Sequence, residues 1–188
     1  WYIPFTMFMI IAVVNSANLT DGLDGLLSGV SLIYSIATGV LFLYFAKVFD
    51  SSFINEPRFV ANRDGMLCMS VFAFAVAGGC LGFLKSNSYP AKVFMGDTGS
   101  LALGGFVAST AYMLQMPLFI ILVGAIYLME VLSVMIQVTY FKATGGKRIF
   151  KMAPIHHHFE LCGWSETRVV AVFSIITAIL CLIGIMAM

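Results

Sequence analysis

The sequence has 188 residues, of which 61% are hydrophobic and only 10% are charged, and its formal net charge is +1. A mean hydropathy of +0.99 lies far above that of soluble domains, so the composition predicts an integral membrane protein. The near-neutral charge supplies no basic surface for nucleic acid, and we expect no nucleic-acid partner.

Apolar runs of about the length that crosses a bilayer as a helix follow one another along the chain. They predict an all-α fold, a polytopic helical bundle with about six membrane-crossing helices in one domain over residues 1–188. The alternating segments that mark a membrane β-barrel are absent from the sequence. The expected helices are Trp1–Val14, Leu26–Ala46, Met66–Leu84, Leu101–Met116 with a first turn near Thr98, Leu118–Phe141 and Val169–Met188.

The positively charged residues gather in one of the two alternating sets of loops between these helices. This set consists of Asn15–Gly25, Lys85–Ser100 and Lys142–Arg168. Because cytoplasmic loops of membrane proteins are enriched in Lys and Arg, we expect these loops, and the functional residues in them, on the cytoplasmic face. The cations of this set are Lys85, Lys92, Lys142, Lys147, Arg148, Lys151 and Arg168, whereas the other set holds only Lys47, Arg58 and Arg63.

The loop Asn15–Gly25 reads NSANLTDGLDG and carries two carboxylates, Asp21 and Asp24, each followed by a glycine. The glycines permit tight turns, so backbone N–H groups and carboxylates can together bind a planar ligand such as a nucleobase. Asn and Asp also cap helices and form turns, and the chemistry alone leaves these two interpretations level.

The segment Ser86–Ser100 reads SNSYPAKVFMGDTGS and places Asp97 at the expected start of a helix. A carboxylate there can hold Mg²⁺, while helix N–H groups and the neighbouring glycines admit a diphosphate close to the backbone. Phe94 can stack on a base. The same residues also fit a helix cap and ordinary packing at the membrane interface, and the segment alone does not decide between these roles.

All three histidines of the chain are consecutive, His156, His157 and His158. Three imidazoles near Lys147, Arg148 and Lys151 suit a polyanionic ligand better than a buried metal site. A solvated polar loop is the alternative interpretation, and the enrichment of cations in cytoplasmic loops explains the Lys and Arg residues without any ligand.

Two polar residues, Glu130 and Gln137, lie on one face of the preceding apolar run. Polar groups at membrane depth usually face a cavity, a partner or a break in a helix. We expect Gln137, which is nearer the cytoplasmic end, to reach the site, and Glu130 to be a structural hydrogen-bonding group.

Three segments taken together carry a family resemblance. They are NLTDGLDG at Asn18–Gly25, VFMGDTGSLALGG at Val93–Gly105 and APIHHHFELCGW at Ala153–Trp164. In this order, across almost the whole chain, they resemble the phospho-N-acetylmuramoyl-pentapeptide transferases, bacterial membrane enzymes of peptidoglycan synthesis. The uninterrupted PIHHHFE segment resembles this branch more than the relatives that transfer N-acetylglucosamine 1-phosphate.

The resemblance implies transfer of phospho-MurNAc-pentapeptide from UDP-MurNAc-pentapeptide to undecaprenyl phosphate, with Mg²⁺, to give lipid I and UMP. It implies a place in the lipid bilayer of the bacterial cytoplasmic (inner) membrane, with the active site facing the cytoplasm. Asp97 matches the magnesium ligand and, with His156, His157 and His158, the catalytic positions. The matching substrate-binding positions are Asn18, Asp21, Gly22, Leu23, Asp24, Asn87, Phe94 and Gln137, of which Gly22, Leu23, Asp24 and Phe94 form the uridine group.

One part of the family pattern is absent from this sequence. The resemblance implies a larger set of membrane helices and, in the N-terminal half, a pair of adjacent aspartates followed by a lysine, but no Asp-Asp pair occurs here. Trp1 also opens directly into an apolar run. We therefore expect the C-terminal portion of a longer protein, with its N-terminal portion and a second copy, in a homodimer, as further partners.

Two other functions fit parts of the sequence. A transferase of UDP-N-acetylglucosamine would share the fold, the magnesium and the uridine site, and would differ at the sugar. A membrane transporter would also place acids and histidines near helices, but it should line a continuous path. Apart from Glu130 and Gln137, the expected helices are nearly free of ionisable or strongly polar groups.

Overall fold

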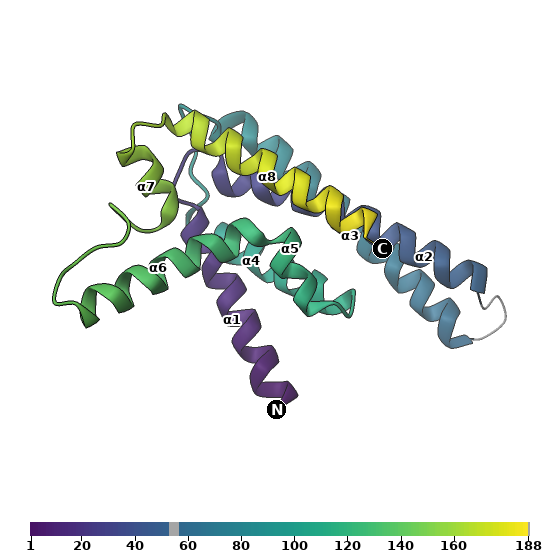
Figure 1. Cartoon of the computed structure of the whole chain (residues 1–188). Helices are drawn as coiled ribbons and strands as arrows, with labels where there is room; N and C mark the ends of the chain where they lie inside the picture. Colours follow the sequence, from purple (N-terminus) through teal and green to yellow (C-terminus); the bar gives the residue numbers. More distant parts are fainter. Residues whose placement is uncertain (53–56, 188) are drawn as a thin grey trace.

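The structure is a computed structural model that describes residues 1–52 and 57–187. In this part of the chain there are eight α-helices and one 3-10 turn, and no strand. In chain order (Figure 1) the elements are α1 (Tyr2–Thr20), α2 (Leu26–Ser52), α3 (Pro57–Asn87), α4 (Gly96–Met113), η1 (Pro117–Phe119), α5 (Ile120–Val123), α6 (Ala125–Ala143), α7 (Ile155–Leu161) and α8 (Glu166–Met186).

The predicted all-α membrane fold is confirmed. Candidate membrane spans, long and apolar enough to cross a bilayer, lie in α1, α2, α3, α6 and α8. The remaining expected crossing, Leu101–Met116, forms as α4, but this helix does not reach the apolar length of the other five. Its first turns carry Asp97, Thr98 and Ser100, which are polar, so α4 begins as part of the loop region.

The expected crossing Leu118–Phe141 is interrupted at Gly124. The turn η1 and the short helix α5 precede this glycine, and α6 follows it. A Cβ at position 124 would lie 2.8 Å from the Ile120 carbonyl oxygen and 2.9 Å from Ile120 Cγ1. Both distances are shorter than real Cβ atoms tolerate, so the break falls where the chain needs a residue without a side chain.

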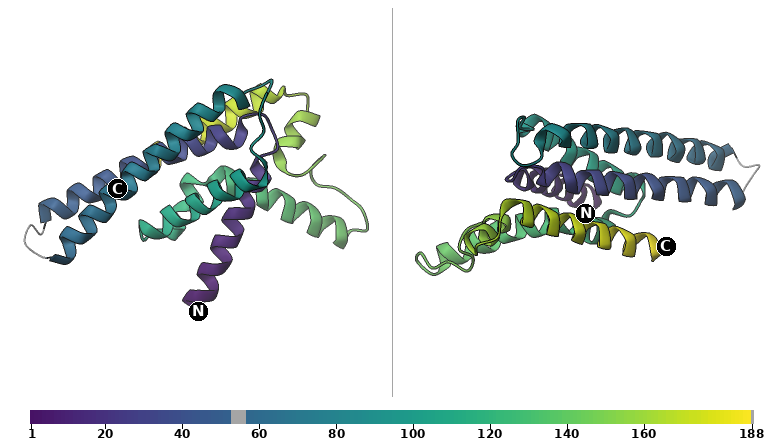
Figure 2. Two further views of the ribbon diagram at one scale, coloured as in Figure 1. Left: turned by 180° about the vertical axis from the view of Figure 1, so that it is seen from behind. Right: turned by 90° about the horizontal axis from the view of Figure 1, so that it is seen from above.

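The helices form two groups. In Figures 1 and 2, α2, α3 and α8 run side by side, while α1 crosses α4 and α6 in the second group. Contacts between α5 and α8 join the groups. Because the loops before α2, α4 and α8 all lie near the C-terminal end of α1, the fold brings together the polar segments that are far apart in the sequence.

Buried polar groups connect the two helix groups. The Tyr34 hydroxyl of α2 donates to the Val107 carbonyl of α4 (3.1 Å) and lies 3.0 Å from Thr110 Oγ1. Ser31 of α2 and Tyr127 of α6 form a hydroxyl pair at 2.8 Å. Unpaired polar groups are costly in such a core, so these pairs fix how α2 lies against α4 and α6.

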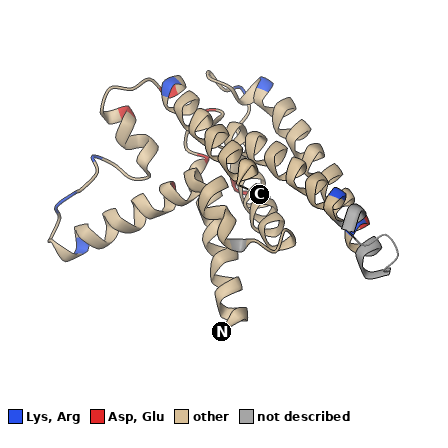
Figure 3. Cartoon of the chain, turned by 45° about the vertical axis from the view of Figure 1, so that its right-hand side comes forward, with Lys and Arg blue, Asp and Glu red and all other residues tan. Residues whose placement is uncertain are grey.

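Most of the charged residues lie in loops or within about two turns of a helix end, and Glu130 is buried within α6. Figure 3 shows blue and red segments at these places and long uncharged stretches between them. This distribution is the one expected for helices that cross a bilayer, since charge in the hydrocarbon layer is costly.

Gly104→Ala is expected to destabilise the crossing of α1 and α4. A Cβ at position 104 would lie 2.7 Å from Val14 Cα and 2.9 Å from its carbonyl oxygen, so the helices must separate, at a cost of about 1–3 kcal/mol. Gly105→Ala is the matched control, because nothing lies within 4 Å of a Cβ there. In thermal unfolding in detergent, only the Gly104 variant should have a midpoint well below that of the wild type. Equal midpoints for the two variants would contradict this close approach.

Candidate active site

Loop 21–25 follows α1 and forms the centre of the candidate site. The Leu23 side chain is 8% exposed and packs in the hydrophobic core. Gly25 has a φ of +81°, which glycine adopts without strain and which turns the chain into α2. With its middle residue anchored in the core, the loop holds Asp21 and Asp24 on either side of that anchor.

Asn18 joins the end of α1 to the start of α4. Its Nδ2 donates to Asp97 Oδ1 (3.1 Å) and to Ser100 Oγ (2.9 Å). Asp97 lies in the first turn of α4, where the helix dipole favours a carboxylate. The Asp97 side chain is exposed, so its carboxylate can bind a cation or accept further hydrogen bonds while Asn18 holds it.

Asp21 lies close enough to Asp97 for the two carboxylates to repel each other. Burial, and to a lesser extent the Asp97 charge, raises the pKa of Asp21 from 3.8 to about 6. A half-buried carboxyl beside a second carboxylate favours either a proton or a cation. The end of α1 and the start of α4 therefore provide two carboxylates and an amide suited to a hard divalent cation.

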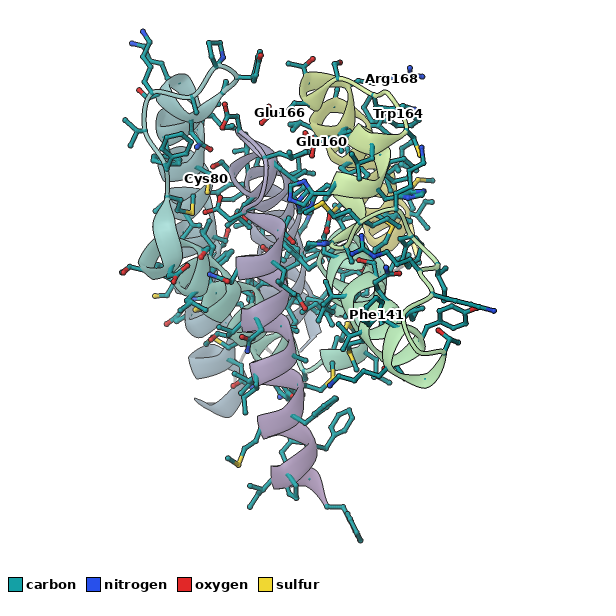
Figure 4. The ribbon with its side chains drawn as sticks, turned by 90° about the vertical axis from the view of Figure 1, so that its left-hand side faces the viewer. Cys80, Phe141, Glu160, Trp164, Glu166 and Arg168 are labelled. Carbon is teal, nitrogen blue, oxygen red and sulfur yellow. The ribbon has the colours of Figure 1, made fainter. Side chains whose placement is uncertain are left out.

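Asp24 connects loop 21–25 to two other elements. Its Oδ2 accepts a hydrogen bond from the Ala91 N–H (2.8 Å), and its own N–H donates to Glu166 Oε1 (2.6 Å). Figure 4 shows Glu166 pointing toward the inside of the molecule, whereas Arg168, on the same helix, points outward. The Asp24 side chain thus shapes the 88–95 loop, and Glu166 ties the same residue to α8.

Asn87 and Phe94 lie at opposite ends of the loop before α4. Asn87 is 3% exposed, and its amide accepts from the Ser28 hydroxyl (2.8 Å) and donates to the Val93 carbonyl (3.0 Å). Phe94 is 73% exposed. The structure therefore gives Asn87 a role in shaping the loop, and it leaves the Phe94 ring free to contact a ligand.

His156, in α7, is buried against both α6 and loop 21–25. Its Nδ1 lies 2.9 Å from Glu130 Oε2. A Cβ added to Gly22 would overlap the His156 ring at Nε2 and Cε1. The absence of a side chain at Gly22 is thus what lets the imidazole approach the loop.

The other two histidines have different surroundings. His157 Nδ1 lies 2.6 Å from Glu160 Oε2, and both side chains are about one-third exposed. His158 Nδ1 accepts from the Lys151 N–H (3.1 Å), so its proton must be on Nε2 when the ring is neutral. The rings of His156 and His157 are neighbours, with centroids 4.2 Å apart, but the three Nδ1 atoms have different partners, and the His156 ring lies against Gly22 of loop 21–25.

Gln137 holds the loop that leads to the histidines. Its Oε1 accepts from the N–H groups of Ile149 (3.1 Å) and Phe150 (3.0 Å), and its Nε2 donates to the Phe150 carbonyl (3.1 Å). Both the oxygen and the nitrogen of the side-chain amide are therefore hydrogen-bonded to the backbone. In this structure the predicted substrate-binding Gln137 acts on the site by fixing this loop.

In the described residues, no group of three or more His, Cys, Asp or Glu side chains is arranged to hold a metal ion. Mg²⁺ commonly takes only one or two protein carboxylates and completes its shell with water and substrate phosphates. Asp97 and Asp21 fit that pattern, whereas the three histidines, whose Nδ1 atoms contact Glu130, Glu160 and the Lys151 N–H, do not form a metal cage.

Several residues of the site carry no distinct signal in the sequence. Glu166 reads as an ordinary acidic residue in the first turn of a helix, yet it binds the backbone of Asp24. Ser100 reads as part of a glycine-rich helix start, yet it shares Asn18 with Asp97. Glu160, three residues after His157, has the spacing of a helical pair, and this is the one contact that the sequence could have suggested.

This geometry defines a class of protein. It is a membrane-integral helical protein with carboxylate, amide and imidazole side chains around one helix end. The family model described as Glycosyl transferase family 4 matches residues 1–115. The chain belongs to this family. The matched region contains the Asn18, Asp21, Asp24 and Asp97 cluster.

The chain is also similar to bacterial proteins named phospho-N-acetylmuramoyl-pentapeptide-transferase, which confirms the resemblance predicted from the three motifs. It is 54% identical over 188 residues to the protein of Clostridium botulinum (strain Eklund 17B / Type B), covering 100% of this chain and 52% of the relative. For Clostridioides difficile (strain 630) the identity is 54% over 186 residues, covering 99% and 52%. For Acetivibrio thermocellus it is 50% over 187 residues, covering 100% and 51%. The chain spans about half the length of the curated relatives it matches.

Proposed function

We propose that this chain forms part of a magnesium-dependent enzyme that transfers phospho-MurNAc-pentapeptide from its UDP carrier to undecaprenyl phosphate, giving lipid I and UMP. The observation that carries the proposal is the hydrogen bond by which Asn18, at the end of α1 and just before loop 21–25, holds Asp97 at the start of α4. It occurs in a chain that is 54% identical to a relative named for this transferase. The loops of the site carry most of the cations, which supports an active site on the cytoplasmic face of the bacterial inner membrane.

Asp97 is the proposed magnesium ligand, and Asp21 is its proposed second carboxylate. When bound, Mg²⁺ would neutralise the diphosphate of the nucleotide and the charge that develops during transfer. Asn18 orients Asp97 by its hydrogen bond of 3.1 Å. A cation between Asp21 and Asp97 would also relieve the repulsion that contributes to the raised pKa of Asp21.

The proposed uridine group consists of the backbone of loop 21–25 together with Phe94. Leu23 is buried in the core, so it has only its backbone to offer a ligand. Asp24 already accepts from the Ala91 N–H through Oδ2, which leaves its second carboxylate oxygen to accept from a base. Phe94, exposed on the adjoining loop, supplies a face on which a base can stack.

The acceptor phosphate attacks the sugar-linked phosphorus of the nucleotide in line, and the bond from this phosphorus to the UMP oxygen breaks. Positioning and charge stabilisation dominate such a reaction, because a phosphate monoester is already largely ionised at neutral pH. The histidines and the cations of the 142–168 region are proposed to bind phosphate oxygens.

The proposed function is tested by UMP release and lipid-product formation in detergent micelles, with this chain supplied together with the N-terminal half of the Clostridium botulinum relative. UDP-MurNAc-pentapeptide and Mg²⁺ should give both products, and chelation of the metal should stop the reaction. UDP-N-acetylglucosamine should give neither. Preference for UDP-N-acetylglucosamine would assign the chain to the related transferases, and no lipid product from either nucleotide would refute the proposal.

Phe94→Ala is expected to weaken uridine-nucleotide binding. A base stacked on an aromatic ring contributes about 1–3 kcal/mol, so the dissociation constant measured by calorimetry should rise by about 5- to 150-fold. Val93→Ala, at the preceding exposed position, shortens an apolar side chain in the same loop without removing a ring, and it should bind normally. Equal affinities for the wild type and Phe94→Ala would assign Phe94 to packing at the membrane surface.

A further inference from the structure

A carboxylate and an imidazole form a fully buried pair that the proposed reaction has not used. Glu130 is 0% exposed and His156 is 1% exposed, and Oε2 of the first lies 2.9 Å from Nδ1 of the second. Each side chain keeps one buried polar atom without a hydrogen-bond partner among the described residues, Glu130 Oε1 and His156 Nε2. A buried polar group without a partner destabilises a fold, so a purely structural pair would be a poor arrangement.

The unpartnered Nε2 faces the candidate site. The ring edge that carries Nε2 and Cε1 lies against Gly22, since a Cβ at position 22 would overlap these atoms. Gly22 itself is exposed on its other side. Only the backbone of a glycine therefore separates Nε2 from the surface of loop 21–25, next to Asp21.

We propose that Glu130 is the positioning residue of His156. Its carboxylate accepts a hydrogen bond from Nδ1–H, which fixes the ring plane and directs Nε2 toward loop 21–25. A small shift of the loop at Gly22 then lets Nε2 contact an oxygen of the nucleotide diphosphate. With Nδ1–H bound to the carboxylate, Nε2 donates to a diphosphate oxygen whenever the ring carries both protons. The contact with the diphosphate rests on the proposed function, whereas the hydrogen bond from Nδ1–H to Glu130 does not.

The Glu130–His156 pair has the arrangement found where a carboxylate orients a histidine that is catalytic or binds a metal. In such sites the carboxylate holds one ring nitrogen, and the other nitrogen contacts the metal or the reacting group. The neighbouring His157–Glu160 pair provides an internal comparison, because it has a similar contact at 2.6 Å but is about one-third exposed. Its His157 ring lies beside His156, with 4.2 Å between the ring centroids.

The proton on Nδ1 is measured directly by nitrogen NMR of the chain in detergent micelles, with ¹⁵N-labelled histidine. The His156 signals are assigned by their loss in His156→Gln. The wild type should show a protonated Nδ1 at His156, and Glu130→Leu should lose this state. Glu160→Gln, the matched control, should change the His157 signals and leave Nδ1 of His156 protonated. An unprotonated Nδ1 in the wild type, or identical His156 signals in Glu130→Leu, would overturn the positioning role.

Glu130→Gln keeps the test decisive if Glu130→Leu does not fold. Its amide oxygen can still accept from Nδ1–H but carries no charge, so the weaker hydrogen bond should move the Nδ1 signal. An unchanged Nδ1 signal in this variant would also overturn the proposal.

Turnover of the complemented protein provides the second measurement. Glu130→Leu should lower kcat by about 10- to 100-fold, the usual effect of removing a group that orients a working histidine, with the KM for the nucleotide nearly unchanged. Glu130→Gln should recover part of the rate. A normal kcat in Glu130→Leu would refute the role in the reaction. Failure of the wild type to use UDP-MurNAc-pentapeptide would refute the proposed function and leave the NMR result to stand on its own.

Discussion

Asp97→Asn is expected to abolish magnesium-dependent UMP release while leaving the protein folded. The substitution removes the exposed carboxylate proposed to hold the metal, and neutral amides are weak ligands for Mg²⁺. Because charge neutralisation supplies several kcal/mol of the stabilisation in phosphoryl transfer, the rate should fall by at least about 1,000-fold.

The structure explains why this variant should keep its fold. Asn18 Nδ2 donates to Asp97 Oδ1 at 3.1 Å, and an asparagine at position 97 still offers a carbonyl oxygen to the same donor. Ser100→Ala is the matched control, since it removes the other acceptor of Asn18 without changing charge. It should retain most of the activity and the magnesium dependence. Normal UMP release by Asp97→Asn would refute the metal assignment, and thermal unfolding checks that both variants are folded.

The sequence predicted the long helices well because their signal is local. Each apolar run carries its own length and composition, and five of the expected crossings are candidate spans in the structure. The break at Gly124 was missed, since the run around it stays apolar and the lack of room for a side chain beside Ile120 appears only in the structure. Composition reports hydrophobicity along a segment, and it does not report whether the segment is one straight helix.

The contacts of the site could not be predicted from local patterns. Asn18 and Asp97 are 79 positions apart, and Asp24 and Glu166 are 142 positions apart. The motifs placed these residues in polar loops at one end of the helices, but only the packing of the helices determines which loops touch. The raised pKa of Asp21 likewise depends on burial and on the distance to Asp97.

Two polar residues of α6 show the limit of reasoning from helix position. Gln137 was expected to reach the site, and the structure uses its amide on the backbone at Ile149 and Phe150. Glu130 was expected to be a structural hydrogen-bonding group, and it does form a hydrogen bond, to the histidine whose ring lies against Gly22. The seven-residue spacing places both on one face, but the partners are supplied by segments beyond the helix.

The isolated 188-residue chain is expected to give no turnover, and the N-terminal half of a relative is expected to restore it. The chain covers 52% of the Clostridium botulinum relative, and the aspartate pair to which the family resemblance gives a catalytic or prenyl-phosphate role is not in its sequence. Loss of a group that positions a reactant can cost orders of magnitude in rate. In α1, large apolar side chains such as Ile3 (72% exposed) and Phe8 (64% exposed) also leave surface for further helices.

The test compares three preparations in detergent micelles containing Mg²⁺, undecaprenyl phosphate and UDP-MurNAc-pentapeptide. They are this chain alone, this chain co-expressed with the N-terminal half of the Clostridium botulinum relative, and a third preparation. The third replaces by asparagine the pair of adjacent aspartates that the family resemblance implies for that half. Only the second should form lipid product, because it alone combines Asp97 and the buried His156 with the aspartate pair. Comparable turnover by the isolated chain would establish that these residues contain a complete site. Full activity in the third preparation would remove the aspartate pair from the reaction and leave the N-terminal half a packing role.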